Sequence, residues 1–427
     1  SDLYVFHLRG NQRTSGELSR REGGKIFGSG SRAPIAISVL VKNPDATERG
    51  HIHFHDIGDY LDQKQKLNII RDFCSINGIT KAHGWRSITP DENNDWLDQV
   101  DQSFDKFPLI GAKRGDKKGL FENYSSGVKT NRDAWCYNSS SNRVLRKMAS
   151  LIRVQNEEVD RYIESGGEVD VESFVIQDPR QISWNRSLRN DVRRGIKREF
   201  DRSKLVLGEY RPFFIQHQYF CRYLNNDVAQ MPKLFPSQET VNLVICATGV
   251  GADSFSALMS KRVPSFDFVE KGQCFPLYLY EEAKPDDGLF ATVGDQASGL
   301  TRRDAITDEG LAHFQAAYPG QAISKEDLFY YIYGLLHSPD YRERFKNNLA
   351  KQLPRIPAVR SFADFAAFRD AGRALGHLHV NFESVEPYMV TFKEGDHRLI
   401  PEAQADPVKF YRVRKMKLGG KGKEKDR

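Results

Sequence analysis

An almost unbroken apolar run at residues 35–41, Ile-Ala-Ile-Ser-Val-Leu-Val, constrains the fold of this chain more than any other stretch. Apolar residues on both sides of a strand favour one that is covered on both faces, as in α/β sheets. A second apolar run, at residues 3–8, predicts another strand. The Gly-rich segment that joins them, residues 9–34, is long for a connection between core strands and is typical of a functional or disordered loop.

Helical patterns dominate much of the remaining chain. Asp62 and Gln65 resemble a capping box that opens a helix, and apolar residues at helical spacing predict a long helix over about residues 143–164. Strands are predicted at residues 241–248 and 275–280. The last third predicts four helices, which open near residues 307, 324, 338 and 361, with the third running to Pro354. We therefore predict a fold that is α/β and α+β, with a helical C-terminal third.

Positive charge is concentrated in residues 180–233. This stretch holds twelve Lys or Arg and five Asp or Glu, whereas the whole chain has a net charge of +6. The stretch thus accounts for the entire positive excess of the protein. Aromatic residues alternate with the basic ones, a pattern typical of surfaces that bind a phosphate backbone. A solvated basic face on an ordinary enzyme explains the same charge equally well.

Bulk features argue against several classes of protein. No apolar run approaches the roughly 20 residues that span a bilayer, and residues 1–11 lack the pattern of a signal peptide. The five cysteines are scattered and form no C-x-x-C pair, which is typical of reduced thiols in a cytoplasm. We therefore expect a cytoplasmic protein without a membrane segment. Because the first strand has no preceding turn or cap, we also expect the sequence to be part of a longer chain.

An alternation of histidines indicates an alternative function. His51, His53 and His55 lie on one face of a predicted strand, and Asp56 follows them. Three imidazoles on one face are donors that a catalytic zinc can use. Neighbouring i, i+2 residues of one strand rarely converge on a single ion, and surface or packing histidines explain the pattern too. A metal-dependent hydrolase is therefore the alternative to a nucleic-acid-binding protein.

Two loops offer groups for phosphates or bases. The backbone amides of residues 28–32, Gly-Ser-Gly-Ser-Arg, fit a phosphate cradle, although the loop matches neither a Walker A motif nor the dinucleotide fingerprint. In residues 124–138, Lys129 and Arg132 can meet phosphates and Asn131 can pair with a base edge. A domain junction whose polar residues complete turns explains the second stretch equally well.

Several ordered strings closely resemble the C-terminal part of type ISP restriction–modification enzymes. Examples are Gly-Gly-Lys-Ile-Phe-Gly-Ser-Gly-Ser-Arg at residues 23–32 and Tyr-Gly-Leu-Leu-His-Ser-Pro-Asp-Tyr-Arg at residues 333–342. The resemblance runs nearly from end to end, through residues 9–14, 23–37, 128–138, 207–213, 271–277, 333–342 and 353–357. These enzymes are single chains with a nuclease, a RecA-like helicase, an adenine methyltransferase and a target recognition domain.

The resemblance implies how the chain is divided. Residues 1–80 would be the C-terminal part of the methyltransferase fold, residues 81–140 a connector, residues 141–411 the target recognition domain, and residues 412–427 a basic disordered tail. The full-length enzyme would methylate the exocyclic amine of adenine with S-adenosylmethionine, translocate with ATP and Mg²⁺, and cleave unmodified DNA. The partners would be double-stranded DNA and the upstream methyltransferase, helicase and nuclease domains of the same polypeptide.

The motifs that carry the chemistry of this family are missing from the sequence. Neither the cofactor loop Asp-Pro-x-x-Gly-x-Gly nor the catalytic Asn-Pro-Pro-Tyr/Phe motif occurs, and the only Asn-Pro is Asn43-Pro44. No Walker motif of a helicase is present. The resemblance therefore implies that this chain alone holds no catalytic, cofactor-binding or metal-binding residues and has no methyltransferase, ATPase or nuclease activity.

The predicted function is sequence-specific recognition of double-stranded DNA, and three regions hold its candidate residues. If residues 187–199 are helical, Arg189, Arg193 and Lys197 share one face at i, i+4 spacing. With Arg194 and Arg198 beside them, these residues would contact the DNA backbone. Side chains with bidentate geometry would read bases, namely Arg211, Gln216, Gln218, Asn225 and Asn226. The junction would add Lys129, Asn131 and Arg132, and the Gly-rich loop would add Arg9, Arg13, Lys25, Ser29 and Arg32.

A pure protein-interaction module is a third interpretation, in which the basic face docks an acidic partner domain. Competition by duplex DNA at moderate salt distinguishes this interpretation from DNA recognition.

Overall fold

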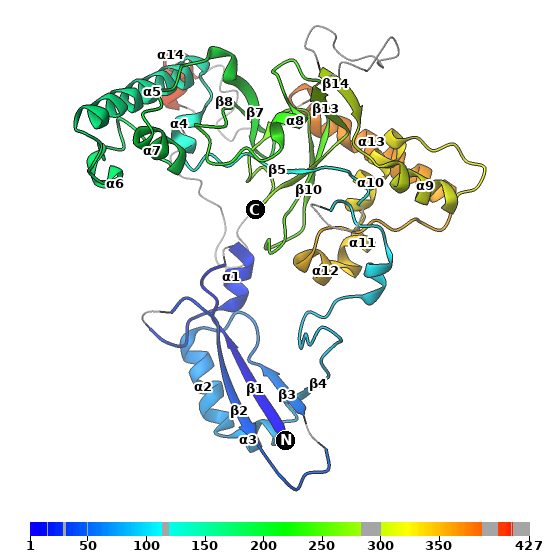
Figure 1. Cartoon of the computed structure of the whole chain (residues 1–427). Coiled ribbons are helices and arrows are strands. Elements are labelled where there is room, and N and C mark those ends of the chain that lie inside the picture. The colour runs from blue at the N-terminus through cyan, green and yellow to red at the C-terminus, as the bar shows by residue number, and fades with distance from the viewer. Residues whose placement is uncertain are drawn as a thin grey trace.

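The computed structural model describes residues 1–14, 16–28, 31–48, 50–112, 119–282, 300–386, 400–410 and 412. Within these residues the chain forms three four-stranded sheets and a two-stranded ribbon. The N-terminal sheet forms a lobe of its own in Figure 1, below two lobes that contain the other sheets. The prediction of a mixed α/β fold with a helical C-terminal third is confirmed. Apart from Arg412, the predicted tail lies outside the described residues.

The N-terminal sheet has the strand order β2-β1-β3-β4. Strand β1 (Asp2–Arg9) pairs antiparallel with β2 (Ile35–Val41) and parallel with β3 (His51–Asp56), and β4 (Arg86–Ile88) closes the other edge. Helices α2 (Gln63–Phe73) and α3 (Ile76–Lys81) pack over one face of β1 and β3. The predicted capping box is confirmed, because Asp62 and Gln65 each accept a hydrogen bond from the backbone amide of the other.

Strand β2 forms where the sequence predicts it, but it is not covered on both faces. Leu40 is 73% exposed, and Ile37, Val39 and Val41 are also exposed. Strand β2 has a neighbour on one edge only, and a hollow of about 270 Å³ lies between its side chains and helices α2 and α3. The prediction of a strand covered on both faces is therefore wrong for the described residues, because helices α2 and α3 pack against β1 rather than against β2.

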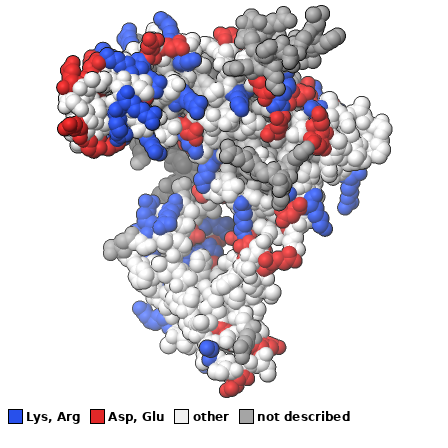
Figure 2. Space-filling model, in the orientation of Figure 1, with Lys and Arg blue, Asp and Glu red and all other residues white. Residues whose placement is uncertain are grey.

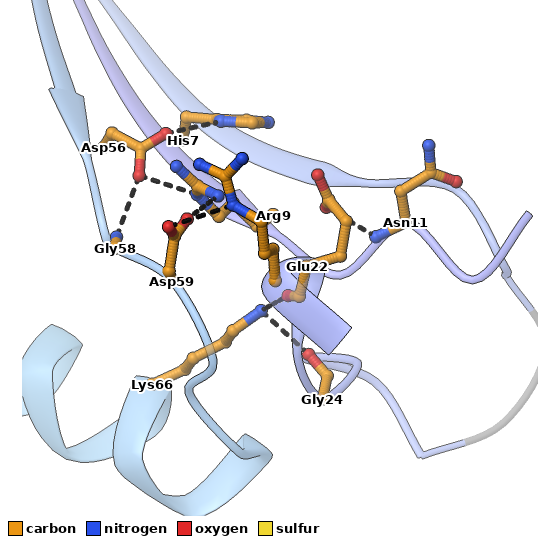
Figure 3. Close-up of polar contacts among 10 residues, drawn as sticks. His7, Arg9, Asn11, Glu22, Gly24, Asp56, Gly58, Asp59 and Lys66 are labelled. Atoms are coloured by element: carbon orange, nitrogen blue, oxygen red, sulfur yellow. Dashed lines mark hydrogen bonds and ion pairs between the residues drawn. The ribbon is translucent and has the colours of Figure 1, made fainter. Parts of the chain in front are cut away.

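A buried lysine helps to hold the Gly-rich segment after β1. The segment contains helix α1 (Gly16–Glu22), and the Lys66 Nζ atom donates to the carbonyl oxygens of Glu22 at 2.7 Å and Gly24 at 2.9 Å (Figure 3). Lys66 is fully buried, and burial lowers its pKa. Gly23 has a φ of +70°, and a Cβ atom there would lie 2.1 Å from the Leu61 carbonyl oxygen, so this position requires glycine.

The second sheet has the order β11-β7-β8-β6 and lies against a long helix. Its strands are β6 (Tyr137–Asn138), β7 (Leu205–Arg211), β8 (Phe214–Tyr219) and β11 (Val263–Pro264). Helix α5 (Ser141–Glu164) buries an apolar face that includes Val144, Met148 and Leu151, which confirms the long helix that was predicted. Three shorter helices surround it, α4 (Asp133–Cys136), α6 (Val171–Phe174) and α7 (Arg186–Arg193).

The third sheet, in the order β10-β9-β12-β5, lies in the main core. Its strands are β5 (Ser125–Ser126), β9 (Val244–Ala247), β10 (Ala257–Ser260) and β12 (Gln273–Pro276). The strand predicted at residues 275–280 is divided at Leu277, because β12 pairs with β9 while the following β13 (Tyr278–Glu282) pairs with β14 (Leu300–Asp304). The strand predicted at residues 241–248 is shorter than expected.

The helices of the C-terminal third begin at their predicted caps. Thr307, Ser324 and Ser361 cap α9 (Asp308–Ala317), α10 (Lys325–Leu336) and α13 (Phe362–Val380). The helix predicted to run from Ser338 to Pro354 is two helices, α11 (Pro339–Arg344) and α12 (Lys346–Lys351), with a break at Phe345. The remaining short elements are η1 (Gln102–Lys106), η2 (Arg202–Lys204), α8 (Met231–Leu234), η3 (Phe382–Ser384), α14 (Pro401–Ala405) and α15 (Pro407–Phe410). No helix in the described part of the chain is long and apolar enough to cross a bilayer.

A half-buried histidine, His337, directly follows α10 and makes stability depend on pH. Burial, with Arg342 and His379 beside it, lowers the pKa of His337 from 6.5 to about 4. Arg342 donates to His337 Nδ1 at 3.2 Å, and Tyr333 bonds His379. Because the folded pKa is depressed, this contribution to stability is complete above pH 6.5 and is lost as the pH falls toward 4.

We expect the free energy of unfolding to fall by about 2 kcal/mol over this window on account of His337, after allowance for partial exposure. Urea denaturation at about pH 7 and at about pH 4.5 measures the loss. The variant His337→Gln should show a correspondingly smaller difference between the two pH values. An unchanged difference would mean that His337 is not the group that titrates.

Candidate nucleic-acid interface

Helix α7 carries the centre of the basic segment, but it is shorter than predicted. Asn185 caps it by accepting from the Leu188 amide, and the helix ends at Arg193. Gly195, with a φ of +68°, reverses the chain two residues later. The prediction of one helix over residues 187–199 is therefore wrong. Arg189 and Arg193 share a face, whereas Lys197 lies beyond the reversal.

Three of the five predicted backbone contacts, Arg189, Lys197 and Arg198, form ion pairs within the protein. The Arg198 guanidinium binds both oxygens of the buried Asp191, with N–O distances of 2.7 and 2.6 Å, and lies 3.7 Å above the ring of Tyr223. The hydrogen bond to Asp191 raises the pKa of Arg198. Lys197 Nζ lies 2.7 Å from Asp160 Oδ1 on α5. Arg198 thus holds α7 to the segment after β8, which leaves its guanidinium less available to the DNA backbone than predicted.

Arg193 and Arg194 remain available at the end of α7. Both are exposed, and neither has a carboxylate partner among the described residues. Arg193 makes one bond to the Asn190 side chain, at 2.7 Å, which leaves other guanidinium donors free. Arg189, in contrast, pairs with Glu172 at 2.8 Å. Arg193 and Arg194 are therefore the residues of this helix best placed to meet phosphates.

Two predicted base readers are buried and cannot reach a base edge in this structure. Gln218 and Asn225 are both 0% exposed. The Asn225 side chain donates to the Tyr219 carbonyl at 3.1 Å and accepts from the Cys221 amide at 2.9 Å, so it shapes the turn after β8. These two assignments are corrected. Gln216 is half-buried on β8, and Asn226 is exposed beside Asn225.

Arg132 is also buried, with only 5% of its surface exposed. Its Nη1 and Nη2 atoms have no hydrogen-bond partner among the described residues, and burial lowers its pKa, with the Arg189 guanidinium adding to the effect. In this structure Arg132 is too buried to reach a DNA backbone, so the structure does not support its predicted phosphate contact. An uncompensated charge in a region of low dielectric raises the positive potential of the adjacent surface. That surface carries Asn131, which is exposed and has a φ of +51°.

The fold brings several candidates from distant segments to this place. The backbone of Lys129 bonds that of Asp227 in both directions, at 2.8 and 2.9 Å, which places Asn226 beside the junction. The turn between β7 and β8 brings Arg211 within 3.8 Å of Asp133 and within 4.0 Å of Asp267. We call this set the junction cluster: Lys129, Asn131, Arg132, Arg189, Arg211 and Asn226.

The predicted DNA-binding residues of the N-terminal lobe are distant in sequence from the junction cluster. Arg9 is held by Asp56 at 2.7 Å and by Asp59 (Figure 3), beside an open cavity of about 1110 Å³ that extends to Asn347 on α12. Arg32 donates to the Gln12 carbonyl at 2.7 Å. Arg13 is exposed, Lys25 is half-buried, and Ser29 lies outside the described residues.

Basic side chains gather in two places on the face shown in Figure 2. One group covers the lobe of α5 and α7, and the other lies near α1 at the top of the N-terminal lobe. Helix α1 contributes Arg20 and Arg21, which are exposed and were not among the predicted residues. No sequence signal identified them, because a seven-residue helix inside a Gly-rich segment leaves little periodicity.

The three histidines of β3 have separate partners. His51 Nε2 lies 3.1 Å from Glu48, His53 Nε2 lies 3.1 Å from Asp2, and His55 Nδ1 lies 2.6 Å from the Gly84 carbonyl. No group of His, Cys, Asp or Glu in the described part of the chain is arranged to hold a metal ion. The structure thus offers no support for the metal-dependent hydrolase.

Comparison with protein-family models identifies the family of this chain. The model of the Type ISP C-terminal specificity domain matches residues 119–427, which is more than half of the chain. This chain belongs to the Type ISP family. The junction cluster and helix α7 both lie inside the region matched by the Type ISP model. No curated protein matches the chain.

Three solved structures resemble the chain over most of its length. A nuclease-deletion mutant of the Type ISP enzyme LlaGI, in complex with a DNA substrate mimic, is 37% identical and covers 91% of this chain with a TM-score of 0.72. The DrdV–DNA complex is 31% identical over 95% of the chain, with a TM-score of 0.74. The ATP-dependent Type ISP enzyme LlaBIII bound to DNA is 32% identical over 91%, also with a TM-score of 0.74. The chain spans only 33%, 37% and 24% of the lengths of these proteins.

Proposed function

We propose that this chain recognises double-stranded DNA in a sequence-specific way, as the target recognition part of a Type ISP restriction–modification enzyme. The observation that carries the proposal is that all three similar structures contain DNA or a DNA mimic. The junction cluster supports it with an uncompensated guanidinium beneath an exposed asparagine. In this proposal Arg193 and Arg194 contact phosphates, and Asn131, Asn226 and Arg211 face the base edges.

The proposal extends to the rest of the polypeptide. Residues 1–80 are the end of an adenine methyltransferase fold, residues 81–140 connect it to the target recognition domain at residues 141–411, and residues 412–427 are a basic tail. S-adenosylmethionine, ATP and Mg²⁺ belong to upstream domains, so this chain alone binds none of them and has no catalytic activity. The exposed apolar side chains of β2 support an upstream partner, because edge strands of this kind are normally covered in folded proteins. The full-length enzyme acts in the cytoplasm.

Removing the two free guanidinium groups of α7 tests the DNA-binding proposal. We expect Arg193→Ala/Arg194→Ala to weaken binding to every duplex, because phosphate contacts carry no sequence information. The slope of log K against log salt should fall by about 2, which is about one for each lost phosphate contact. Fluorescence anisotropy with cognate and scrambled duplexes, over a series of salt concentrations, measures both quantities.

Arg180→Ala is the matched control. Arg180 is 88% exposed and belongs to the same basic segment, but Asp178 pairs with it at 2.9 Å, so its loss should leave the slope unchanged. If the double variant keeps the slope of the unmodified chain, α7 does not face DNA. If the unmodified chain binds no duplex at low salt, the interpretation as a protein-interaction module is favoured instead.

A further inference from the structure

A second basic surface lies away from the junction cluster, in a cavity of about 690 Å³. Three segments line it: the start of β7 with the preceding η2, the chain that follows β8, and the turn between β10 and β11. None of the six junction-cluster residues lines this cavity. Cavities that hold small ligands in proteins have volumes of about 300–1,000 Å³, so this one has room for a small molecule.

The cavity is lined by more positive than negative side chains. Four cations line it, Lys204, Arg222, Lys261 and Arg262, and Glu239 is the one carboxylate among the lining residues. Arg222 has no ion-pair partner among the described residues. Lys204 lies 3.6 Å from Asp201, an exposed pair that is screened by water. An anionic group would therefore be attracted to the cavity.

Two of the cations are oriented by residues from other elements. Arg262 Nη1 donates to Glu209 Oε1 at 3.1 Å, and Glu209 is only 2% exposed. Lys261 Nζ donates to the neutral side chain of Asn381, after α13, at 2.7 Å. This hydrogen bond restrains the side chain, and the nearest carboxylate that interacts with Lys261 is the buried Glu209, which already binds Arg262. Preorganised cations of this kind lose less conformational entropy when they bind an anion.

Aromatic rings form the apolar part of the wall. Phe220, Tyr223 and Phe235 line the cavity together with Pro232 and Pro236. Tyr223 is 47% exposed where it lines the cavity, and Arg198 lies over one face of its ring. Stacking of a nucleobase on an aromatic ring is favourable for every base, because each base has a π-face.

We propose that this cavity binds a nucleoside 5′-phosphate, with the phosphate among the four cations and the base against the aromatic wall. The nucleotide is either free in solution or one unit of a nucleic-acid strand. In the second case the inference rests on the proposed function and makes the cavity a second contact for DNA. The combination of charge-assisted hydrogen bonds and stacking distinguishes such a ligand from inorganic phosphate, which uses the cations alone.

Calorimetric titration of the purified chain tests the inference with deoxyadenosine monophosphate, thymidine monophosphate, deoxyadenosine and inorganic phosphate. We expect one saturable site for a monophosphate and weaker binding of the nucleoside and of phosphate. Arg222→Ala/Lys261→Ala should weaken monophosphate binding by at least about tenfold, because it removes two charge-assisted contacts. Both side chains are exposed, so the variant should fold, and circular dichroism checks this. Lys233→Ala, an exposed cation of α8 outside the cavity lining, should bind as the unmodified chain does.

Short single strands and duplexes form the second arm of the experiment. If the unmodified chain binds a strand but no free nucleotide, and the double variant does not bind the strand, the ligand of the cavity is a unit of a nucleic-acid strand. Binding of phosphate as tight as that of the nucleotide, or equal binding by the double variant, overturns the inference. If duplex binding persists unchanged while no nucleotide effect is found, the inference fails and the proposed function stands. If the nucleotide binds through the cavity but no duplex binds, the inference stands and the proposed function fails.

Discussion

Replacing Arg198 by alanine is expected to lower the free energy of unfolding by about 3 kcal/mol, because breaking a buried ion pair leaves a buried charge without a partner. Asp191 is 4% exposed, and both of its carboxylate oxygens bind the Arg198 guanidinium. The variant also removes the guanidinium that covers the ring of Tyr223 at 3.7 Å. Urea denaturation followed by circular dichroism measures the change in stability.

The double variant Arg198→Ala/Asp191→Ala is the control for the ion pair. It removes the stranded carboxylate together with its partner, so it should be more stable than Arg198→Ala alone. Measuring duplex binding by Arg198→Ala tests the alternative, in which Arg198 contacts a phosphate. If Arg198→Ala unfolds at the same urea concentration as the unmodified chain but binds every duplex more weakly, Arg198 is a phosphate contact and not a structural residue.

Replacing Lys66 by alanine is expected to destabilise the N-terminal lobe by a comparable amount, about 2–4 kcal/mol. The fully buried ammonium group donates to two backbone carbonyl oxygens, those of Glu22 and Gly24. Its loss leaves both oxygens without that donor and opens a cavity beneath the Gly-rich segment. Hydrogen exchange should then show faster exchange of the amides at residues 10–28, because this segment loses one of the side chains that tie it to α2, and among the described residues only the bond from Gln63 to the Ile26 carbonyl remains between them.

One further variant separates the hydrogen bonds of Lys66 from its volume, and a second variant is a control. Lys66→Met fills most of the space but cannot donate, so it should remain clearly destabilised. Lys64→Ala, at an exposed position of the same helix, should leave both stability and exchange unchanged. Protection of residues 10–28 that survives in Lys66→Met would show that packing, and not the two hydrogen bonds, holds the segment.

Local signals predicted the elements of this fold well. Asp62, Thr307, Ser324 and Ser361 each cap a helix at the expected position, because a cap depends on side-chain and backbone atoms only three residues apart. The long apolar face of α5 was likewise visible in the periodicity of its sequence. Family membership was also recognisable, since five of the seven ordered strings of the sequence lie in the region that the family model matches.

The candidate site was much less predictable from sequence. Arg193 and Arg198 belong to one basic run, yet Arg193 is exposed while Arg198 binds Asp191. Asn225 and Asn226 are adjacent and chemically identical, yet only Asn226 reaches the surface. Nothing local distinguishes the members of these pairs. The difference arises from the direction of the chain after Gly195 and from the turn that follows β8.

The sequence alone thus determined the α/β and α+β class, most helix starts, the concentration of charge in residues 180–233 and the Type ISP membership, because each depends on neighbouring residues or on ordered strings. Only the tertiary structure decided which cations are neutralised, which amides are buried, and that Lys204, Arg222 and Lys261 line one cavity. Ion pairing and burial join residues that are far apart in the chain, and their energies depend on distance and solvent exclusion, which exist only once the chain is folded.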